Sequence, residues 1–222
     1  MLMMSGACVK INGADILNDV HLHVGPHTLC GLLGRNGAGK TTLMRALMGA
    51  LPIAKGSLTF DGCPIAALPA HQRARLGIGY MPEDRRLVPD LSVEENVLLP
   101  FDAAGSSSRT NELDRVFAAI PELVLLRKRP AVSLSGGQQK LVALGRAIAI
   151  GTSLLLLDEP TEGVAPSLAK RLIGILREIR AQGPAILISD SNERHLDGLV
   201  DRLYLIDRGH VALQSESTVG VS

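Results

Sequence analysis

Apolar and polar residues alternate in the N-terminal part of the chain, whereas continuous apolar runs occur further on. The alternation from Ile16 to Val24 predicts a strand with one face exposed to water. Residues 28–33, 154–157 and 185–188 are short, mainly apolar runs, which are typical of strands buried on both faces of a parallel sheet. The pattern therefore predicts a buried sheet together with a separate, partly exposed β region.

Helical periodicity is found between these strands. A helix is expected from about Gly39 to Gly49, and residues 168–179 predict a helical crossover between two buried strands. Residues 58–60 and 77–81 are expected to form two more short strands. Strands that alternate with helices along the chain are typical of an α/β fold with a mainly parallel sheet.

The stretch from about residue 90 to 150 is expected to be helical throughout. Residues 91–126 predict helices that are interrupted by a flexible polar link at Gly105–Ser108. A further helix should follow, with Leu141 and Ile148 near one face. We therefore expect a helical subdomain inserted into the α/β core.

Composition excludes several classes of protein. The chain has 222 residues, 2% aromatic residues and a net charge of +1, so neither a base-stacking surface nor a basic nucleic-acid interface is expected. Cys8, Cys30 and Cys63 are odd in number and lack metal-site spacing, which favours a reducing cytosol. No uncharged apolar stretch approaches the roughly 18–20 residues that cross a bilayer. Any function at a membrane would therefore depend on a partner chain.

A glycine-rich segment follows the predicted strand at residues 28–33. It fits the pattern G-x-x-x-x-G-K-[ST] between a strand and a helix, the context in which this pattern forms a phosphate-binding loop. The segment comprises Gly34, Arg35, Asn36, Gly37, Ala38, Gly39, Lys40, Thr41 and, next in the chain, Thr42. Its backbone N–H groups and the helix N-terminus favour an anion. Lys40 is expected to contact the β- and γ-phosphates of ATP, and Thr41 to bind Mg²⁺.

A second candidate site element ends the apolar run at residues 154–157. Asp158 and Glu159 follow it directly, and ligands bind at the carboxyl ends of strands in open α/β sheets. Asp158 is expected to support Mg²⁺, directly or through water, and Glu159 to act as general base toward the attacking water. Many buried strands end in an acidic residue, so this element alone is weak evidence for a site. It becomes strong evidence because a phosphate loop precedes it in the chain.

A third element is the sequence Leu-Ser-Gly-Gly-Gln at residues 134–138. Ser135 could simply cap a helix, but paired glycines cost helix stability and are left unexplained by that interpretation. Alternatively, a serine and free N–H groups at a helix N-terminus bind phosphate. The residues concerned are Ser135, Gly136, Gly137 and Gln138.

These three elements, in this order, resemble the ATPase subunits of ABC transporters. The resemblance covers nearly the whole chain and implies one domain over residues 1–222. Its fold would be a P-loop NTPase core with a mainly parallel sheet, an antiparallel β subdomain and a helical subdomain inserted at about 90–150. It also implies ATP and Mg²⁺ as cofactors and a head-to-tail dimer of identical or related subunits. In such a dimer, Ser135 and Gly137 of one subunit contact the γ-phosphate held by Lys40 of the other.

Two longer stretches are similar to the branch of this family that serves uptake of branched-chain amino acids, urea and short amides. They comprise residues 77–86 together with 91–96, and residues 159–166. Glu83 stands where most of the family has a glutamine that senses Mg²⁺ and the permease, and this branch often has glutamate there. Ala165 replaces the aspartate that is usual in the dimer-contact loop. The branch implies import through a separate permease, with a possible extracytoplasmic solute-binding protein.

Two positions depart from the family pattern. The aromatic residue that stacks on adenine should fall near Ile11, where no Phe, Tyr or Trp lies. The switch histidine should occupy the position of Ser191, which can donate a hydrogen bond to phosphate but carries no charge. His195 lies four residues further on and is expected to be an ordinary surface residue. Hydrolysis is therefore expected either to be slow or to depend on Glu159 alone.

The function expected from the sequence is that of an ATP-binding and ATP-hydrolysing transport subunit. It would lie in the cytoplasm, peripheral to the inner face of the cell membrane, without binding nucleic acid. One alternative is an ABC-type ATPase that acts away from membranes, although the chain has neither a coiled-coil insertion nor a second cassette. The other is a degenerate nucleotide-binding regulator, which Ser191 and Ile11 favour and the intact Lys40, Asp158 and Glu159 oppose.

Overall fold

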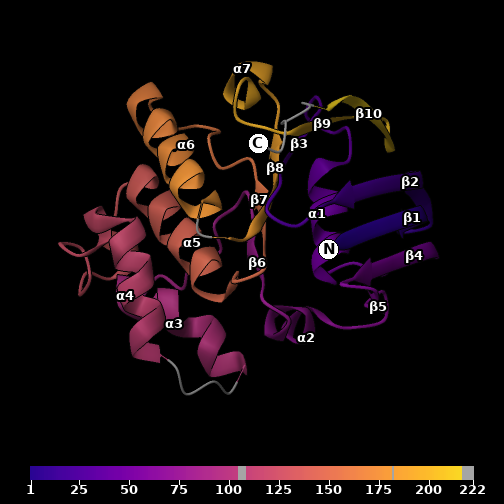
Figure 1. Ribbon diagram of the computed structural model, residues 1–222. Helices are drawn as coiled ribbons and strands as arrows, with labels where there is room; N and C mark the ends of the chain where they lie inside the picture. Colours follow the sequence, from indigo (N-terminus) through magenta and orange to yellow (C-terminus); the bar gives the residue numbers. More distant parts are fainter. Residues whose placement is uncertain (105–108, 182, 217–222) are drawn as a thin grey trace.

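The computed structural model describes residues 1–104, 109–181 and 183–216, with side chains left undescribed at 102–111. The predicted polar link at Gly105–Ser108 lies outside these residues. Figure 1 shows the arrangement. The elements are β1 (Leu2–Ile11), β2 (Ala14–Val24), β3 (Leu29–Leu33), α1 (Lys40–Met48), β4 (Lys55–Phe60), β5 (Cys63–Pro64), α2 (Ala70–Arg75), β6 (Ile78–Met81), α3 (Val93–Ala104), α4 (Arg109–Ala119), η1 (Pro121–Leu123), η2 (Ala131–Ser133), α5 (Gly136–Ile150), β7 (Leu154–Asp158), α6 (Pro166–Arg180), β8 (Ala185–Asp190), α7 (Glu193–Leu196), β9 (Arg202–Asp207) and β10 (His210–Glu216).

The larger sheet is mainly parallel, as the buried apolar runs predict. Within the described residues its order is β10-β9-β3-β8-β7-β6, and every pair is parallel except β9 with the edge strand β10. Helix α1 lies on one side of this sheet, while α5 and α6 lie on the other (Figure 1). The expectation of an α/β fold of the P-loop NTPase type is confirmed.

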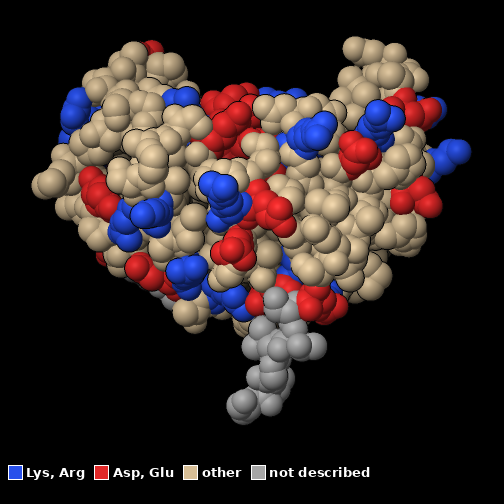
Figure 2. All heavy atoms as spheres, turned by 90° about the horizontal axis from the view of Figure 1, so that it is seen from above, with Lys and Arg blue, Asp and Glu red and all other residues tan. Residues whose placement is uncertain are grey.

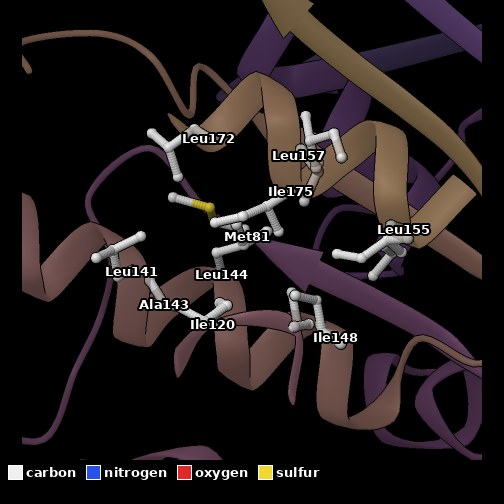
Figure 3. Close-up of a cluster of buried hydrophobic side chains, with 14 of the residues drawn as sticks. Met81, Ile120, Leu141, Ala143, Leu144, Ile148, Leu155, Leu157, Leu172 and Ile175 are labelled. Atoms are coloured by element: carbon white, nitrogen blue, oxygen red, sulfur yellow. The ribbon is translucent and has the colours of Figure 1, made fainter. Parts of the chain in front are cut away.

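The core has two halves because successive side chains of a strand point to opposite faces. On β7, Leu154 and Leu156 pack in the half that contains α1 and the smaller sheet. Leu155 and Leu157 pack in the other half against α5 and α6, where Figure 3 shows Leu144 and Ile175 among their neighbours. A strand buried on both faces needs no polar alternation, which explains the continuous leucine run.

The smaller sheet is antiparallel and has the order β2-β1-β4-β5 in the described chain. The alternation at Ile16–Val24 forms most of β2, with Val20, Leu22 and Val24 buried and Asp19 and His21 exposed. Strand β1, which the sequence analysis did not identify, pairs with both β2 and β4. Figure 1 places this sheet beside α1, on the side opposite the helical part.

A buried arginine fixes the far end of α1. Arg73 is 1% exposed, and its guanidinium donates hydrogen bonds of 2.8 and 2.7 Å to the carbonyls of Ala46 and Leu47 in the last turn of that helix. It also donates to the carbonyls of Ala66 and Leu68. Because the last carbonyls of a helix have no partner within it, this side chain pairs the carbonyl of Leu47 and gives that of Ala46, which also accepts from the N–H of Gly49, a second partner.

The helical part contains α3, α4 and α5, which pack on one another at the left of Figure 1. No helix of the described residues is long and apolar enough to cross a membrane. On the face shown in Figure 2, acidic and basic side chains are interspersed, in keeping with a net charge of +1. The surface in this view therefore presents no broad field of one sign.

Candidate active site

The candidate residues meet at one edge of the larger sheet. In the ladder between β3 and β8, Leu33 is paired with Asp190, and between β7 and β8, Asp158 is paired with Ser189. The carboxyl ends of these parallel strands therefore lie side by side. Three strands lead directly from this edge into the phosphate loop, the acidic pair and the loop containing Ser191, so residues far apart in the sequence become neighbours.

The phosphate loop leads from β3 to α1. Gly39 precedes the helix with a φ of 113°, a left-handed conformation that glycine adopts without strain. The loop borders a cavity of about 320 Å³. Its walls are formed by Ile16, Asn36, Gly37, Gly39, Lys40, Thr41, Thr42, Glu83 and Glu159. A helix N-terminus that faces a cavity with exposed N–H groups is suited to an anion.

Lys40 is the buried cation of this cavity. It is 4% exposed, and its ammonium donates hydrogen bonds of 2.6 and 3.0 Å to the carbonyls of Gly34 and Arg35. The same nitrogen lies 3.0 Å from Glu159 Oε1 in an ion pair whose side chains are 3% and 6% exposed. The residue expected to bind phosphate and the residue expected to activate water are therefore in direct contact across the cavity.

Asp158 supplies a buried carboxylate next to this pair. Its Oδ1 accepts a 2.7 Å hydrogen bond from Ser189 Oγ, while Oδ2 is buried without a hydrogen-bond partner among the described residues. Burial raises the pKa of Asp158, an effect opposed by hydrogen bonds from Ser189 and Thr41. Thr41 Oγ1 also donates to Glu83 at 3.3 Å. These oxygens are the ligand type that Mg²⁺ prefers, so the residues fit a magnesium ion.

Glu159 has an unusual backbone. Its φ of 48° is left-handed, which costs a residue other than glycine about 1–2 kcal/mol. The N–H of Glu159 approaches the backbone oxygen of Ser189 at 3.2 Å and its hydroxyl at 3.1 Å. The carbonyl of Glu159 accepts a 2.8 Å hydrogen bond from Lys140 Nζ. Such strain persists only where the surroundings hold it, and it is often found at active sites.

The sequence analysis did not identify Ser189 and Lys140 as site residues. A serine at the end of an apolar strand gives no signal of its own, because its role follows from the β7–β8 register. Lys140 did offer a signal, since it lies four and eight residues before Leu144 and Ile148 on the apolar face of the predicted helix. A lysine within an apolar stripe either extends to solvent or has a buried partner.

Ser135 caps α5. Its hydroxyl accepts a hydrogen bond from the N–H of Gln138 at 3.3 Å, and the Gln138 side chain accepts one from the N–H of Ser135 at 2.9 Å. Ser135 and Gly136 are exposed, Gly137 is partly exposed, and none of the residues 135–138 belongs to the described lining of the phosphate cavity. Ser135 can therefore cap α5 while the N-terminus of this helix stays exposed to a phosphate.

The two departures from the family pattern lie at different places around the cavity. Ile11 ends β1 and does not belong to the described lining, whereas Ile16 at the start of β2 does. Ser191 is exposed and lines a neighbouring hollow with Gly34 and Arg35, at the first residues of the phosphate loop. Of these two isoleucines, Ile16 therefore borders the described cavity and Ile11 does not.

His195 is more than an ordinary surface residue, which corrects the sequence-based expectation. Its side chain is 30% exposed, and Nδ1 lies 3.0 Å from both Asp190 Oδ2 and Thr161 Oγ1. Thr161 also donates to the buried Asp190 carboxylate at 2.5 Å. The imidazole thus connects the loop after β7 with the end of β8, and the sequence alone did not reveal these contacts, which span 34 and five residues.

Comparisons with known proteins agree on one family. A family model described as ABC transporter matches residues 17–162. A probable ABC transporter ATP-binding protein of Azorhizobium caulinodans is 35% identical, covering 95% of this chain and 75% of the relative. The lipopolysaccharide export system ATP-binding protein LptB of Escherichia coli is 35% identical, covering 93% and 86%. BraG, the high-affinity branched-chain amino acid transport ATP-binding protein of Pseudomonas aeruginosa, is 32% identical, covering 89% and 84%.

Solved structures have the same fold. An ATP-binding cassette of an ABC transporter in its ADP conformation superposes with a TM-score of 0.82 at 26% identity, covering 96% of this chain and 89% of that one. A dimeric cassette in a post-hydrolysis state bound to ADP and Pi gives a TM-score of 0.86. At 20% identity, covering 97% of this chain and 98% of that one, the latter similarity concerns the fold alone.

Proposed function

This chain belongs to the ABC transporter ATP-binding proteins, an ATPase family, and from this premise we propose that the cavity at the phosphate loop is where it binds and hydrolyses ATP. The observation that carries the proposal is the buried contact between Lys40 and Glu159, which places a phosphate-binding cation 3.0 Å from a carboxylate. Positioning and charge stabilisation account for most of phosphoryl transfer, and both groups are in place for them.

Each residue has a defined part in this reaction. The loop N–H groups and the α1 N-terminus bind the phosphates, and Lys40 neutralises charge that develops on the transferred group. Glu159 accepts a proton from the attacking water, because its carboxylate borders the same cavity. Mg²⁺ would be held by Thr41 and Asp158, with Glu83 beside them, and would neutralise charge on the phosphate oxygens.

The complete site requires a second subunit. Ser135 and the two glycines after it lie exposed at the N-terminus of α5 and outside the described cavity lining of their own chain. A helix N-terminus with free N–H groups is an anion site, so it would bind the γ-phosphate held by another copy or by a related subunit. A dimeric cassette with ADP and Pi is known among structures of this fold. Hydrolysis would then accompany opening and closing of the dimer.

The transport function follows from the family, whereas the solute is proposed from sequence resemblance. Both BraG, named for amino acid transport, and LptB, named for lipopolysaccharide export, match this chain at similar identity. We favour import of amino acids or related amides, since residues 77–86, 91–96 and 159–166 resemble that branch. The ATPase would lie at the cytoplasmic face of a membrane, bound to a permease, with a solute-binding protein outside. Candidate solutes should stimulate ATP turnover in vesicles that contain its permease.

The test of the catalytic proposal is Mg²⁺-dependent ATP hydrolysis by the purified chain and by Lys40→Ala. The substitution should reduce turnover at least 100-fold, because it removes the cation that contacts the transferred phosphate. Lys55→Ala, an exposed lysine on β4, is the matched control and should leave turnover unchanged. Equal turnover in both variants would exclude this cavity as the site of hydrolysis.

A further inference from the structure

Lys140 is a buried lysine that the proposed reaction does not yet use. It is 3% exposed, and its ammonium donates a 2.8 Å hydrogen bond to the backbone carbonyl of Glu159. The side chain comes from α5, whereas Glu159 follows β7. The helix that begins at Ser135 is thereby connected directly to the peptide of the catalytic carboxylate.

The Glu159 peptide is held from both sides. Its N–H is bound by Ser189, and its carbonyl accepts from Lys140 and, at 3.2 Å, from the N–H of Glu162. With a φ of 48°, this backbone is in a conformation that depends on such contacts. Because backbone φ and ψ set the position of Cβ and restrict the allowed side-chain rotamers, contacts that hold this backbone also limit where the carboxylate can point.

A charge at this position is costly for stability. Burial lowers the pKa of Lys140, while the carboxylates of Glu162, Glu159 and Glu83 favour its charged form. Replacing buried ion pairs by apolar side chains of similar volume is often neutral or stabilising, so buried charges are weak evidence of a role in stability. A charged donor beside the general base is therefore better explained by what it does for Glu159 than by what it does for the fold.

We propose that Lys140 is a positioning residue for ATP hydrolysis, which fixes the Glu159 peptide and thereby keeps the carboxylate directed toward the phosphate cavity. It contacts the backbone of Glu159, so it acts through that residue and does not itself touch ATP. The contact also joins the catalytic carboxylate to the helix whose first turn carries Ser135. The inference rests on the proposed function of Glu159 as general base.

The test compares Lys140→Met, which keeps the length of the stem and removes the donor, with Lys140→Arg, which keeps a charged donor. The methionine variant should lose roughly tenfold in kcat, while KM for ATP and Kd for ADP stay within twofold, because phosphate binding is untouched. The arginine variant should retain most of kcat. Lys170→Met, an exposed lysine on α6, is the control and should match the parent protein.

Thermal unfolding of each variant separates positioning from a structural role. A methionine variant that is as stable as the parent but tenfold slower supports the proposal, and unchanged kcat overturns it. Equal losses of kcat and stability in both the methionine and arginine variants also overturn it. If the methionine variant does not fold, Lys140→Leu, which also lacks a donor, carries the same test. Lys40→Ala is measured in parallel, since activity in that variant would refute the catalytic proposal independently of Lys140.

Discussion

Neutralising Glu159 should strengthen nucleotide binding, because in this structure its carboxylate forms an ion pair with Lys40, the cation expected to bind phosphate. Its Oε1 lies 3.0 Å from Lys40 Nζ, and both side chains are almost fully buried. At an effective dielectric constant of about 20, two unit charges at this distance attract by roughly 5 kcal/mol. An incoming phosphate restores most of that attraction to Lys40. We therefore expect the ion pair to weaken nucleotide binding by only about 1–2 kcal/mol, which corresponds to a roughly tenfold higher Kd.

The assay is calorimetric titration of ADP into Glu159→Gln and the parent protein without Mg²⁺. ADP is chosen because it lacks the γ-phosphate that would join two subunits, and omission of the metal prevents turnover. Glu178→Gln is the control, since that carboxylate is exposed on α6 and lies near Arg171, not Lys40, in the structure. The expected result is a Kd about tenfold lower for Glu159→Gln and unchanged for the control. Equal or weaker binding by Glu159→Gln would refute the competition between carboxylate and phosphate.

Three further predictions concern the surroundings of the site. Arg73→Met should lower the free energy of unfolding by about 3–5 kcal/mol in urea titrations, since it leaves buried carbonyls unpaired, whereas the exposed Arg75→Met should cost little. Asp158→Asn should abolish hydrolysis yet raise Tm at pH 7. Burial raises the pKa of Asp158, so its protonated form stabilises the fold at low pH, and this contribution is lost as pH rises through the folded-state pKa. The Tm gap between Asp158→Asn and the parent should therefore be larger at pH 7 than at pH 4. Ile16→Ala should weaken ATP binding several-fold while Ile11→Ala does not, and competition by GTP on both variants tests whether either residue contacts the base.

The sequence predicts most of the fold because its strongest signals are local. A leucine run such as residues 154–157 can be buried on both faces only in a covered sheet, and a glycine-rich loop between strand and helix has few other uses. The same reasoning placed the phosphate loop and the acidic pair at one edge, since carboxyl ends of parallel strands meet there. Strand β1 was not identified, because its pairing with β2 and β4 depends on long-range contacts.

The remaining site features depend on register and on side-chain reach. Ser189 contacts Asp158 because the β7–β8 ladder sets these two residues opposite one another. His195 reaches Asp190 across a short turn, and Lys140 reaches Glu159 from another element of the chain. The spacing of these residues along the sequence does not predict any of these contacts. They become visible only when the strands and helices are assembled, so the sequence indicates the chemistry and the structure supplies its supporting residues.

The proposal that each ATP site is shared between two subunits can be tested by mixing two inactive variants. Lys40→Ala removes the phosphate cation, whereas Ser135→Asp keeps the helix cap and places a negative charge toward the γ-phosphate. In a mixed dimer, one site carries both substitutions and the other carries neither. Random pairing gives half mixed dimers with one of two sites intact, so an equimolar mixture should recover up to about a quarter of parent ATP turnover, an estimate that assumes the charge effects stay local to each site. A mixture no more active than its two components would contradict the shared site.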